Sequence, residues 1–351
     1  MKAWQKNIRT VEPYIPGEQP NEKDMIKLNT NENPYPPSPK VEAVKQELDR
    51  LRLYPDPNAT ALVEAIANYH GLSKEQVFVG VGSDDVLAMS FLTFFNSDKP
   101  LLFPDITYSF YDVWAELFRI PYETKALDDK FEIVASDYYG ENGGVIFPNP
   151  NAPTSLAVGL DFIRDILNHN QDVIVVVDEA YIDFGGESAL ALIQEYDNLL
   201  VVRTFSKSRS MAGLRIGYAM GNPELIQALN SVKNSYNSYT MNYPSIVMGT
   251  ASIEDDEYFC QMVKKVVDTR EWFEKELTRL GFTYPKSSAN FVFATHKSVS
   301  AKEIYEKARE QKIFVRYFNK PRIDNYLRIS IGTDEEMKTF VTFLEELLEN
   351  Q

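Results

Sequence analysis

Residues 173–181 read Val-Ile-Val-Val-Val-Asp-Glu-Ala-Tyr, and this stretch decides the fold class. A continuous β-branched run of this kind is typical of a strand that is buried on both faces of a parallel sheet. Acidic and phenolic side chains follow the strand directly. Open α/β sheets bind their ligands at the carboxyl ends of such strands. We therefore expect an α/β fold with a ligand site beside Asp178 and Tyr181.

Short apolar runs alternate with amphipathic stretches on both sides of this strand, which is typical of a parallel α/β sheet. Further strands are expected at 77–81, 101–103, 144–147, 199–202 and 216–220, and helices at 84–95 and 160–168.

The pattern changes after about residue 245 and indicates a smaller α+β domain. A long helical pattern covers 245–280, with a break expected near 255–256. Strands are then expected at 290–294, 313–317 and 327–331, and helices at 301–311 and 335–349. The Pro-rich start of the chain disfavours a helix. We expect three regions, namely an N-terminal arm at 1–35, a large domain at 36–245 and a small domain at 246–351 that packs with the arm.

The composition excludes several classes of partner. A net charge of −15, from 36 basic and 51 acidic residues, disfavours nucleic acid and anionic membranes. The single cysteine and the three scattered histidines predict neither a disulfide nor a metal site. The first ten residues lack the apolar core of a signal peptide, and the most apolar stretch, 86–95, is shorter than a bilayer requires. We expect a cytoplasmic protein.

The run 80–85, Gly-Val-Gly-Ser-Asp-Asp, joins an expected strand to an expected helix. The free N–H groups at a helix N-terminus bind anions, so Ser83 and Asp84 are candidates for holding a phosphate. An ordinary helix cap is the alternative interpretation. A helix-capping role is likewise the alternative for Asp178, whose desolvated carboxylate otherwise requires a cationic partner such as a protonated ring nitrogen.

The run 204–208, Thr-Phe-Ser-Lys-Ser, follows another buried strand, and Arg215 lies eight residues after Lys207. A lysine among small hydroxyl residues at a strand end is suited to Schiff-base chemistry, although a solvated loop lysine is the commoner case. Arg215 can bind a phosphate in a bidentate manner. In the small domain, Arg316 and Arg328 occupy strand positions, where an anion site and a structural ion pair are equally good interpretations. Together these groups match pyridoxal phosphate with an anionic substrate.

The same residues resemble a known family over almost the whole chain. The run 178–181, followed by Ser206-Lys207 and Arg215, is similar to the signature of the fold-type I aminotransferases. Asn151-Ala152-Pro153-Thr154 resembles their Asn-Pro-Thr-Gly loop, and 82–85 resembles their phosphate-binding turn. Within that group the chain resembles the histidinol-phosphate aminotransferases. The matching runs are Tyr-Ile-Pro-Gly at 14–17, Leu-Asn-Thr-Asn-Glu-Asn-Pro-Tyr at 28–35, Arg-Leu-Tyr-Pro-Asp at 52–56 and Leu-Arg-Ile at 327–329.

The resemblance implies a three-layer α/β/α large domain with a mostly parallel seven-stranded sheet and a smaller α+β domain. It also implies a homodimer that uses pyridoxal 5'-phosphate to transfer an amino group between L-histidinol phosphate and 2-oxoglutarate in histidine biosynthesis.

The resemblance further implies a role for individual residues. Lys207 forms the Schiff base and moves the proton, Asp178 pairs with the pyridine nitrogen, and Tyr181 and Asn151 contact the ring hydroxyl. Tyr108 stacks on the ring. The implied phosphate ligands are Ser83, Asp84, Ser206 and Arg215, with Tyr54 from the partner subunit. The implied substrate contacts are Arg316 and Arg328, with Tyr14 and Asn33 at the entrance.

The chain departs from the family pattern in two places. The loop has Ala152 before its proline and Ser155 after its threonine, so the Asn151 assignment could shift by one residue. Arg209 is a second arginine near Lys207 and competes with Arg215, although the spacing favours Arg215. Three alternative functions stay open: an aromatic or other amino-acid aminotransferase, a pyridoxal-phosphate decarboxylase of a phosphorylated amino acid, and a non-catalytic binding protein.

Overall fold

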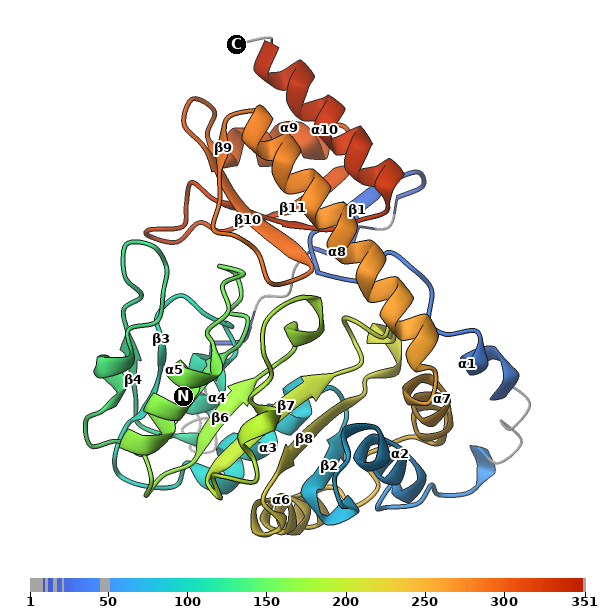
Figure 1. The fold of residues 1–351 in the computed structure, drawn as a ribbon, viewed down its shortest axis with the longest axis vertical. Helices are drawn as coiled ribbons and strands as arrows, with labels where there is room; N and C mark the ends of the chain where they lie inside the picture. The colour runs from blue at the N-terminus through green and yellow to red at the C-terminus, as the bar shows by residue number, and fades with distance from the viewer. Residues whose placement is uncertain (1–8, 10–11, 15–17, 21, 45–50, 350–351) are drawn as a thin grey trace, which may run out of the picture.

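The structure, a computed structural model, describes residues 9, 12–14, 18–20, 22–44 and 51–349 (Figure 1). Much of the expected arm lies outside the described residues. The first ten residues, which are expected not to form a signal peptide, lie outside the described residues except for residue 9. Residues 15–17 of the matching run at 14–17 also lie outside them. None of the helices in the described part of the chain is long and apolar enough to cross a membrane.

A seven-stranded sheet forms the larger half of the molecule (Figure 1). Its spatial order is β2 (Val77–Gly80), β8 (Gly217–Gly221), β7 (Leu199–Thr204), β6 (Val175–Asp178), β5 (Gly144–Pro148), β3 (Leu101–Pro104) and β4 (Tyr122–Lys125). Neighbouring strands pair in parallel except at β8, which is antiparallel to both β7 and β2. The expected mostly parallel sheet is confirmed, and the run at 216–220 forms its one antiparallel strand.

Helices cover both faces of this sheet because alternate residues of its central strands point to opposite sides. Val175 and Val177 belong to one apolar core, whereas Val176 belongs to the other. The first core also contains residues of α2 (Thr60–His70), α5 (Leu160–His169) and α7 (Tyr243–Ile253). The second also contains residues of α3 (Ser83–Phe94), α4 (Tyr111–Phe118) and α6 (Pro223–Tyr236). The expected three layers are therefore present.

A second, five-stranded sheet lies beside the first. Its order is β1 (Ile26–Leu28), β11 (Ile313–Tyr317), β12 (Leu327–Ser330), β10 (Phe291–His296) and β9 (Phe282–Thr283). This sheet packs against α8 (Asp256–Arg279), α9 (Ala301–Glu310) and α10 (Asp334–Glu349), and together they enclose a third apolar core of the molecule. The long helical pattern breaks where it is expected to, because α7 ends at Ile253 and α8 begins at Asp256.

Three short strands are not predicted from the sequence pattern. β4 has exposed or half-buried side chains along its whole length, so it lacks an apolar signal, and β9 has only two residues. β1 comes from the N-terminal segment and pairs in parallel with β11, which places Leu28 in the third core. The remaining short elements are α1 (Lys40–Ala43) and the 3-10 helices Lys74–Gln76, Ala135–Tyr138, Ile182–Phe184, Ala189–Leu192 and Ala212–Leu214.

The strand pattern of the small sheet also sets the direction of two arginines. Leu327 and Ile329 belong to the third core, and Arg328 alternates with them on the opposite face. Arg316 and Arg328 are direct cross-strand partners in the β11–β12 pair. The two guanidinium groups therefore leave the same face of the small sheet, away from its helices.

Candidate active site

A cavity lies where β5, β6 and β7 end and where α3 begins. The carboxyl ends of these parallel strands meet at one edge of the sheet, which is the usual ligand site of such folds. The cavity is lined by Ser83, Asp84, Tyr108, Pro148, Ala152, Asp178, Ala180, Tyr181, Ser206, Lys207 and Arg215. Most residues that the sequence assigns to a cofactor are thus brought together, although they lie far apart along the chain.

Asp178 ends β6 and is only 4% exposed. Its Oδ2 accepts a hydrogen bond from the Tyr111 hydroxyl at 3.0 Å, and its Oδ1 accepts one from the Ala180 N–H at 3.2 Å. Burial raises the pKa of this carboxyl group to about 7. In the described part of the chain, no Lys, Arg or His nitrogen lies within 4.0 Å of the carboxylate. A cation in the cavity would therefore supply the partner that a desolvated carboxylate requires.

Lys207 follows β7 and points its half-buried amine toward the same cavity. Its Nζ donates to the Thr30 carbonyl at 3.3 Å and lies 5.7 Å from the centre of the Tyr181 ring. Among the described residues, no carboxylate oxygen lies within 4.0 Å of this nitrogen. The amine is therefore placed to react rather than to hold an ion pair.

The turn before α3 forms one end of the cavity, beside Arg215. Arg215 Nη1 donates to the Ser206 hydroxyl at 3.4 Å, and its Nη2 donates to Asp84 Oδ2 at 3.1 Å. Gly82 has φ +85°, and a Cβ there would lie 2.5 Å from the Arg215 guanidinium group. A Cβ on Gly217 would lie 2.3 Å from the Gly82 carbonyl carbon. Both positions require glycine so that β8 and Arg215 can approach the first N–H groups of α3.

Tyr181 connects the cavity to the small sheet. Its ring packs edge-on against Phe291 of β10, with centroids 5.0 Å apart. Its hydroxyl accepts a hydrogen bond from Asn31 Nδ2 at 3.0 Å, and Asn31 Oδ1 accepts one from the Ser330 hydroxyl at 2.8 Å. Asn31 is not among the site residues predicted from the sequence, although it lies in the matching run at 28–35.

Asn151 does not line the cavity, whereas the neighbouring Ala152 does. The Asn151 Nδ2 donates to the Ile106 carbonyl at 2.9 Å and to the Thr154 hydroxyl at 3.0 Å. Its Oδ1 accepts a hydrogen bond from the Thr107 hydroxyl at 2.9 Å. The Asn151 side chain thus fixes the loop that precedes Tyr108. Both hydrogens of its amide nitrogen are used in these two bonds.

A second cavity adjoins the first and shares Asp84, Tyr108, Ala152, Tyr181 and Lys207 with it. It extends to Tyr14, Thr30, Asn31, Phe318, Arg316 and Arg328. The expected entrance residue Tyr14 lies here, where its ring stacks on Phe110 at 4.1 Å. The other expected entrance residue, Asn33, instead donates to the backbone carbonyls of Lys207 and Ser208 at 3.2 Å each.

The two arginines of this cavity have few partners of their own. Arg328 Nη2 donates to the Asn29 carbonyl at 3.0 Å, and its buried Nε has no hydrogen-bond partner. Burial, and to a smaller extent Arg316, lower the pKa of Arg328. Both guanidinium groups lie near the Phe318 ring, at 5.5 and 5.7 Å from its centre. No acidic group within the described ranges pairs with either one, so the site fits a bound anion.

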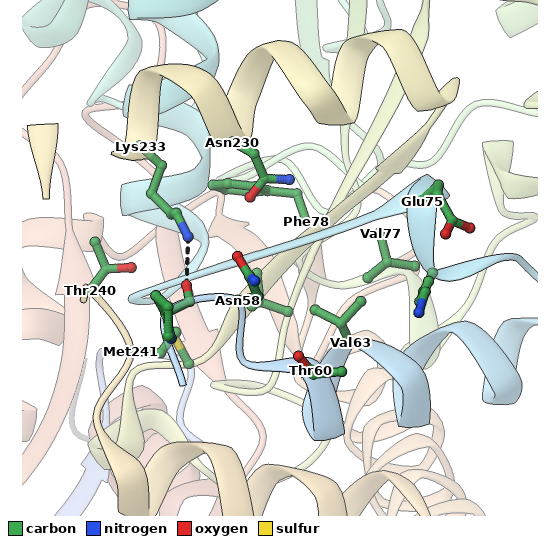
Figure 2. Close-up of a pocket in the computed structure, with 13 residues that line it drawn as sticks. Asn58, Thr60, Val63, Glu75, Val77, Phe78, Asn230, Lys233, Thr240 and Met241 are labelled. Atoms are coloured by element: carbon green, nitrogen blue, oxygen red, sulfur yellow. Dashed lines mark hydrogen bonds between the residues drawn. The ribbon is translucent and has the colours of Figure 1, made fainter. Parts of the chain in front are cut away.

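Tyr54 lines neither cavity. Its side chain is 83% exposed and lies against the Tyr239 ring, with centroids 4.8 Å apart. Figure 2 shows a separate pocket, in which the Lys233 amine donates to the Pro57 carbonyl at 2.7 Å. This contact fixes the segment that follows Tyr54 to α6. Burial lowers the pKa of Lys233, and the pocket shares no residue with the two cavities.

Arg209 points away from the end of the cavity that Arg215 lines. Its Nη1 donates to the Ser252 carbonyl at 2.7 Å, and its guanidinium carbon lies 4.1 Å from the centre of the Phe259 ring. Only Arg215 of the two competing arginines lines the cavity.

A buried ionic network lies behind the two loops that carry Asp178 and Lys207. Arg203 Nε donates to Glu179 Oε2 at 3.0 Å, and its Nη1 lies 3.4 Å from Asp183 Oδ1. The Ser208 hydroxyl donates to the other Asp183 oxygen at 2.5 Å. The network therefore joins the loop that carries Asp178 to the loop that carries Lys207.

The sequence matches the family model for aminotransferases of class I and II over residues 23–344. It is 53% identical to the histidinol-phosphate aminotransferase of Lactococcus lactis subsp. cremoris over 351 residues, which cover 99% of each chain. It is 52% identical to the histidinol-phosphate aminotransferase of Clostridium beijerinckii over 351 residues, which cover 99% of this chain and 98% of the relative.

Solved structures share the fold. The histidinol-phosphate aminotransferase of Clostridium acetobutylicum has a TM-score of 0.86 at 23% identity, covering 93% of this chain and 100% of that chain. The histidinol-phosphate aminotransferase of Sinorhizobium meliloti, solved in complex with pyridoxal-5'-phosphate, has a TM-score of 0.84 at 23% identity, covering 93% and 91%. The match to the family model and the identity to full-length relatives show that the chain belongs to the class I and II aminotransferases.

Proposed function

We propose that this chain is a pyridoxal-phosphate-dependent histidinol-phosphate aminotransferase, which transfers the amino group between L-histidinol phosphate and 2-oxoglutarate in histidine biosynthesis. One observation carries the proposal. A lysine amine and a buried carboxyl group line the same cavity, beside a helix N-terminus suited to phosphate, and the described residues provide an ion-pair partner for neither. Relatives that are 52–53% identical over nearly their full length carry the same name.

The residues of the first cavity fit each part of pyridoxal phosphate. Asp178 would hold the cationic ring nitrogen, Lys207 would bind the aldehyde, and Tyr108 would stack on the ring. Ser83, Ser206, Arg215 and the backbone N–H of Asp84 would hold the phosphate, because the Asp84 carboxylate itself pairs with Arg215. We assign the ring hydroxyl to Tyr181 and give Asn151 the role of fixing the loop beside it, because its amide already bonds within that loop.

The chain contributes proton transfer and orientation to the reaction. When bound, the cofactor supplies a cationic ring that stabilises the negative charge left when the substrate loses its α-proton. The Lys207 amine lies in the cavity and would act as the base that moves the proton. Its hydrogen bond to the Thr30 carbonyl holds it there. Asn33 holds the Lys207 backbone, and so restricts how far the amine can move.

The second cavity would bind the substrate. Histidinol phosphate carries a phosphate and no carboxylate, whereas glutamate carries two carboxylates. One cationic site must therefore accept either anion beside the reacting amine. Arg316 and Arg328 suit this requirement, because no acidic residue in the described chain competes for them and planar guanidinium groups bind both kinds of anion.

We also propose a homodimer. The large apolar side chains of Leu51, Leu53, Tyr54, Tyr236 and Tyr239 are exposed, and the rings of Tyr54 and Tyr239 are in contact. Exposed groups of this kind mark association surfaces. In the dimer, Tyr54 would reach the cofactor phosphate of the partner subunit.

The first prediction concerns the reaction. The cofactor-loaded protein should form glutamate from 2-oxoglutarate and histidinol phosphate with ping-pong kinetics. Lys207→Ala should lower the rate by at least about 10²-fold, because proton transfer by the amine is lost. Lys265→Ala, which changes a lysine beside Tyr35 outside both cavities, is the matched control.

The same assay separates the competing functions. Transfer from aromatic amino acids but not from histidinol phosphate would reject the substrate and keep the chemistry. Release of carbon dioxide without consumption of the keto acid would indicate a decarboxylase. A protein that transfers nothing with any donor would be a binding protein.

The second prediction concerns the anion site. Arg328→Ala should lower kcat/KM by about tenfold or more for both histidinol phosphate and glutamate, because a charge-assisted hydrogen bond to the anion is lost. Arg309→Ala removes an arginine of the surface pair with Glu18 and should change neither value. Unchanged kinetics for both substrates in Arg328→Ala would remove Arg328 from the site.

The third prediction concerns the dimer. Sedimentation should give twice the mass of one chain, and Tyr54→Phe should raise the Kd for pyridoxal phosphate by about tenfold, since a donor to the phosphate is lost. Tyr122→Phe, at the edge strand β4, serves as the control. A monomer that binds the cofactor with full affinity would contradict the proposal.

A further inference from the structure

Tyr111 is a residue of the site that the sequence analysis does not identify. It is the first residue of α4, and its side chain is completely buried. Its hydroxyl donates to Asp178 Oδ2 at 3.0 Å, across 67 residues of sequence. Apart from the Ala180 N–H at 3.2 Å, it is the only donor to this carboxyl group among the residues that the structure describes.

The surroundings of Asp178 make this donor important. Burial disfavours the charged carboxylate, and the negative charges of Asp84 and Glu179 act in the same direction, whereas the Tyr111 hydroxyl lowers the pKa. Among the described residues, the other titratable groups that line the cavity are Tyr108, Tyr181, Lys207 and Arg215. The Tyr111 hydroxyl therefore opposes the effect of burial and favours the charged form of the carboxyl group.

A purely structural role for Tyr111 would need only its ring. The ring packs edge-on against Phe103 and Tyr108, each 5.8 Å away between centroids, and contacts Phe91 at 6.1 Å. Phenylalanine would fill this space equally well. A hydroxyl placed in an apolar core is unfavourable unless it finds an acceptor, and here the acceptor is the one carboxylate of the cavity that has no cation.

We propose that Tyr111 is a positioning residue, whose phenol holds the Asp178 carboxylate ionised and correctly oriented to receive the cationic ring nitrogen of a cofactor. This inference rests on the proposed function, because it takes pyridoxal phosphate as the ligand. Tyr111 itself does not line the cavity and acts only through Asp178.

The direction of the effect follows from the charge balance. Without the Tyr111 hydroxyl, the charged form of Asp178 loses a donor, so its pKa rises above about 7. A larger fraction of the carboxyl group is then neutral at a given pH and does not pair with a cation. Affinity for the cofactor should therefore fall as the pH decreases, and in the variant this fall should begin at a higher pH than in the unchanged protein.

The test measures the Kd for pyridoxal phosphate by fluorescence quenching of the cofactor-free protein between about pH 6 and 9. This range lies on both sides of the raised pKa of Asp178, which is about 7. The variant is Tyr111→Phe. The control is Tyr138→Phe, because Tyr138 is also a fully buried tyrosine but its hydroxyl has no hydrogen-bond partner and lies outside the cavities. The control ligand is an analogue of the cofactor with carbon in place of the ring nitrogen.

We expect Tyr111→Phe to raise the Kd for pyridoxal phosphate by about tenfold near pH 7, with a smaller change at pH 9. The Kd for the ring-carbon analogue should not change, and Tyr138→Phe should leave both values unaltered. Equal weakening of both ligands would mean that Tyr111 only supports the fold, and no weakening of either would mean that its hydroxyl is irrelevant. Either result overturns the inference.

A double-mutant cycle tests the same point. Here the Kd is compared with and without Tyr111→Phe in a protein that carries Asp178→Asn, in which the side chain at position 178 cannot ionise. Tyr111→Phe should then have no further effect on the Kd, because its route through the carboxylate is gone. A tenfold effect that persists in this background would overturn the inference. If the unchanged protein binds neither ligand, the proposed function fails. If it binds pyridoxal phosphate and only the Tyr111 results disagree, the proposed function stands and this inference alone fails.

Discussion

Asp178 is a carboxyl group held in the interior at the end of β6, and the described chain gives it no cation. Such a group is unfavourable unless it pairs with a cation, so the cavity beside it is suited to a ligand that carries positive charge. The neighbouring acid, Glu179, is neutralised by Arg203 of the adjacent strand β7. That contrast between adjacent carboxyl groups separates a structural ion pair from a position kept for a ligand.

The two sheets supply different parts of the same site. The seven-stranded sheet brings Asp178 and Lys207 together at its carboxyl edge, whereas the small sheet directs Arg316 and Arg328 toward that edge. The N-terminal segment joins them, because β1 pairs with β11 and Asn31 bonds to the Tyr181 hydroxyl. In the proposed function, the large sheet would therefore hold the cofactor and the small sheet the substrate anion, and Tyr181 lines both cavities.

Much of this arrangement can be predicted from local sequence. The run at 173–181 indicates both a buried strand and the polar residues at its end, and the same holds for the run that leads to Lys207. The roles of Tyr111 and Asn31 cannot be predicted in this way, because their partners lie 67 and 150 residues away. Nothing in the residues around Tyr111 distinguishes a packing ring from a hydrogen-bond donor. β1 is likewise missed because three residues carry too little pattern.

Lys207 is proposed to bind the cofactor covalently beside Asp178. Loading the protein with pyridoxal phosphate, reducing it with borohydride and mapping the labelled peptide by mass spectrometry tests this most directly. We expect the cofactor mass on the peptide that contains Lys207, and no label on that peptide when Lys207 is changed to arginine. A label on another lysine, or no label at all, would contradict the assignment of this cavity as the active site.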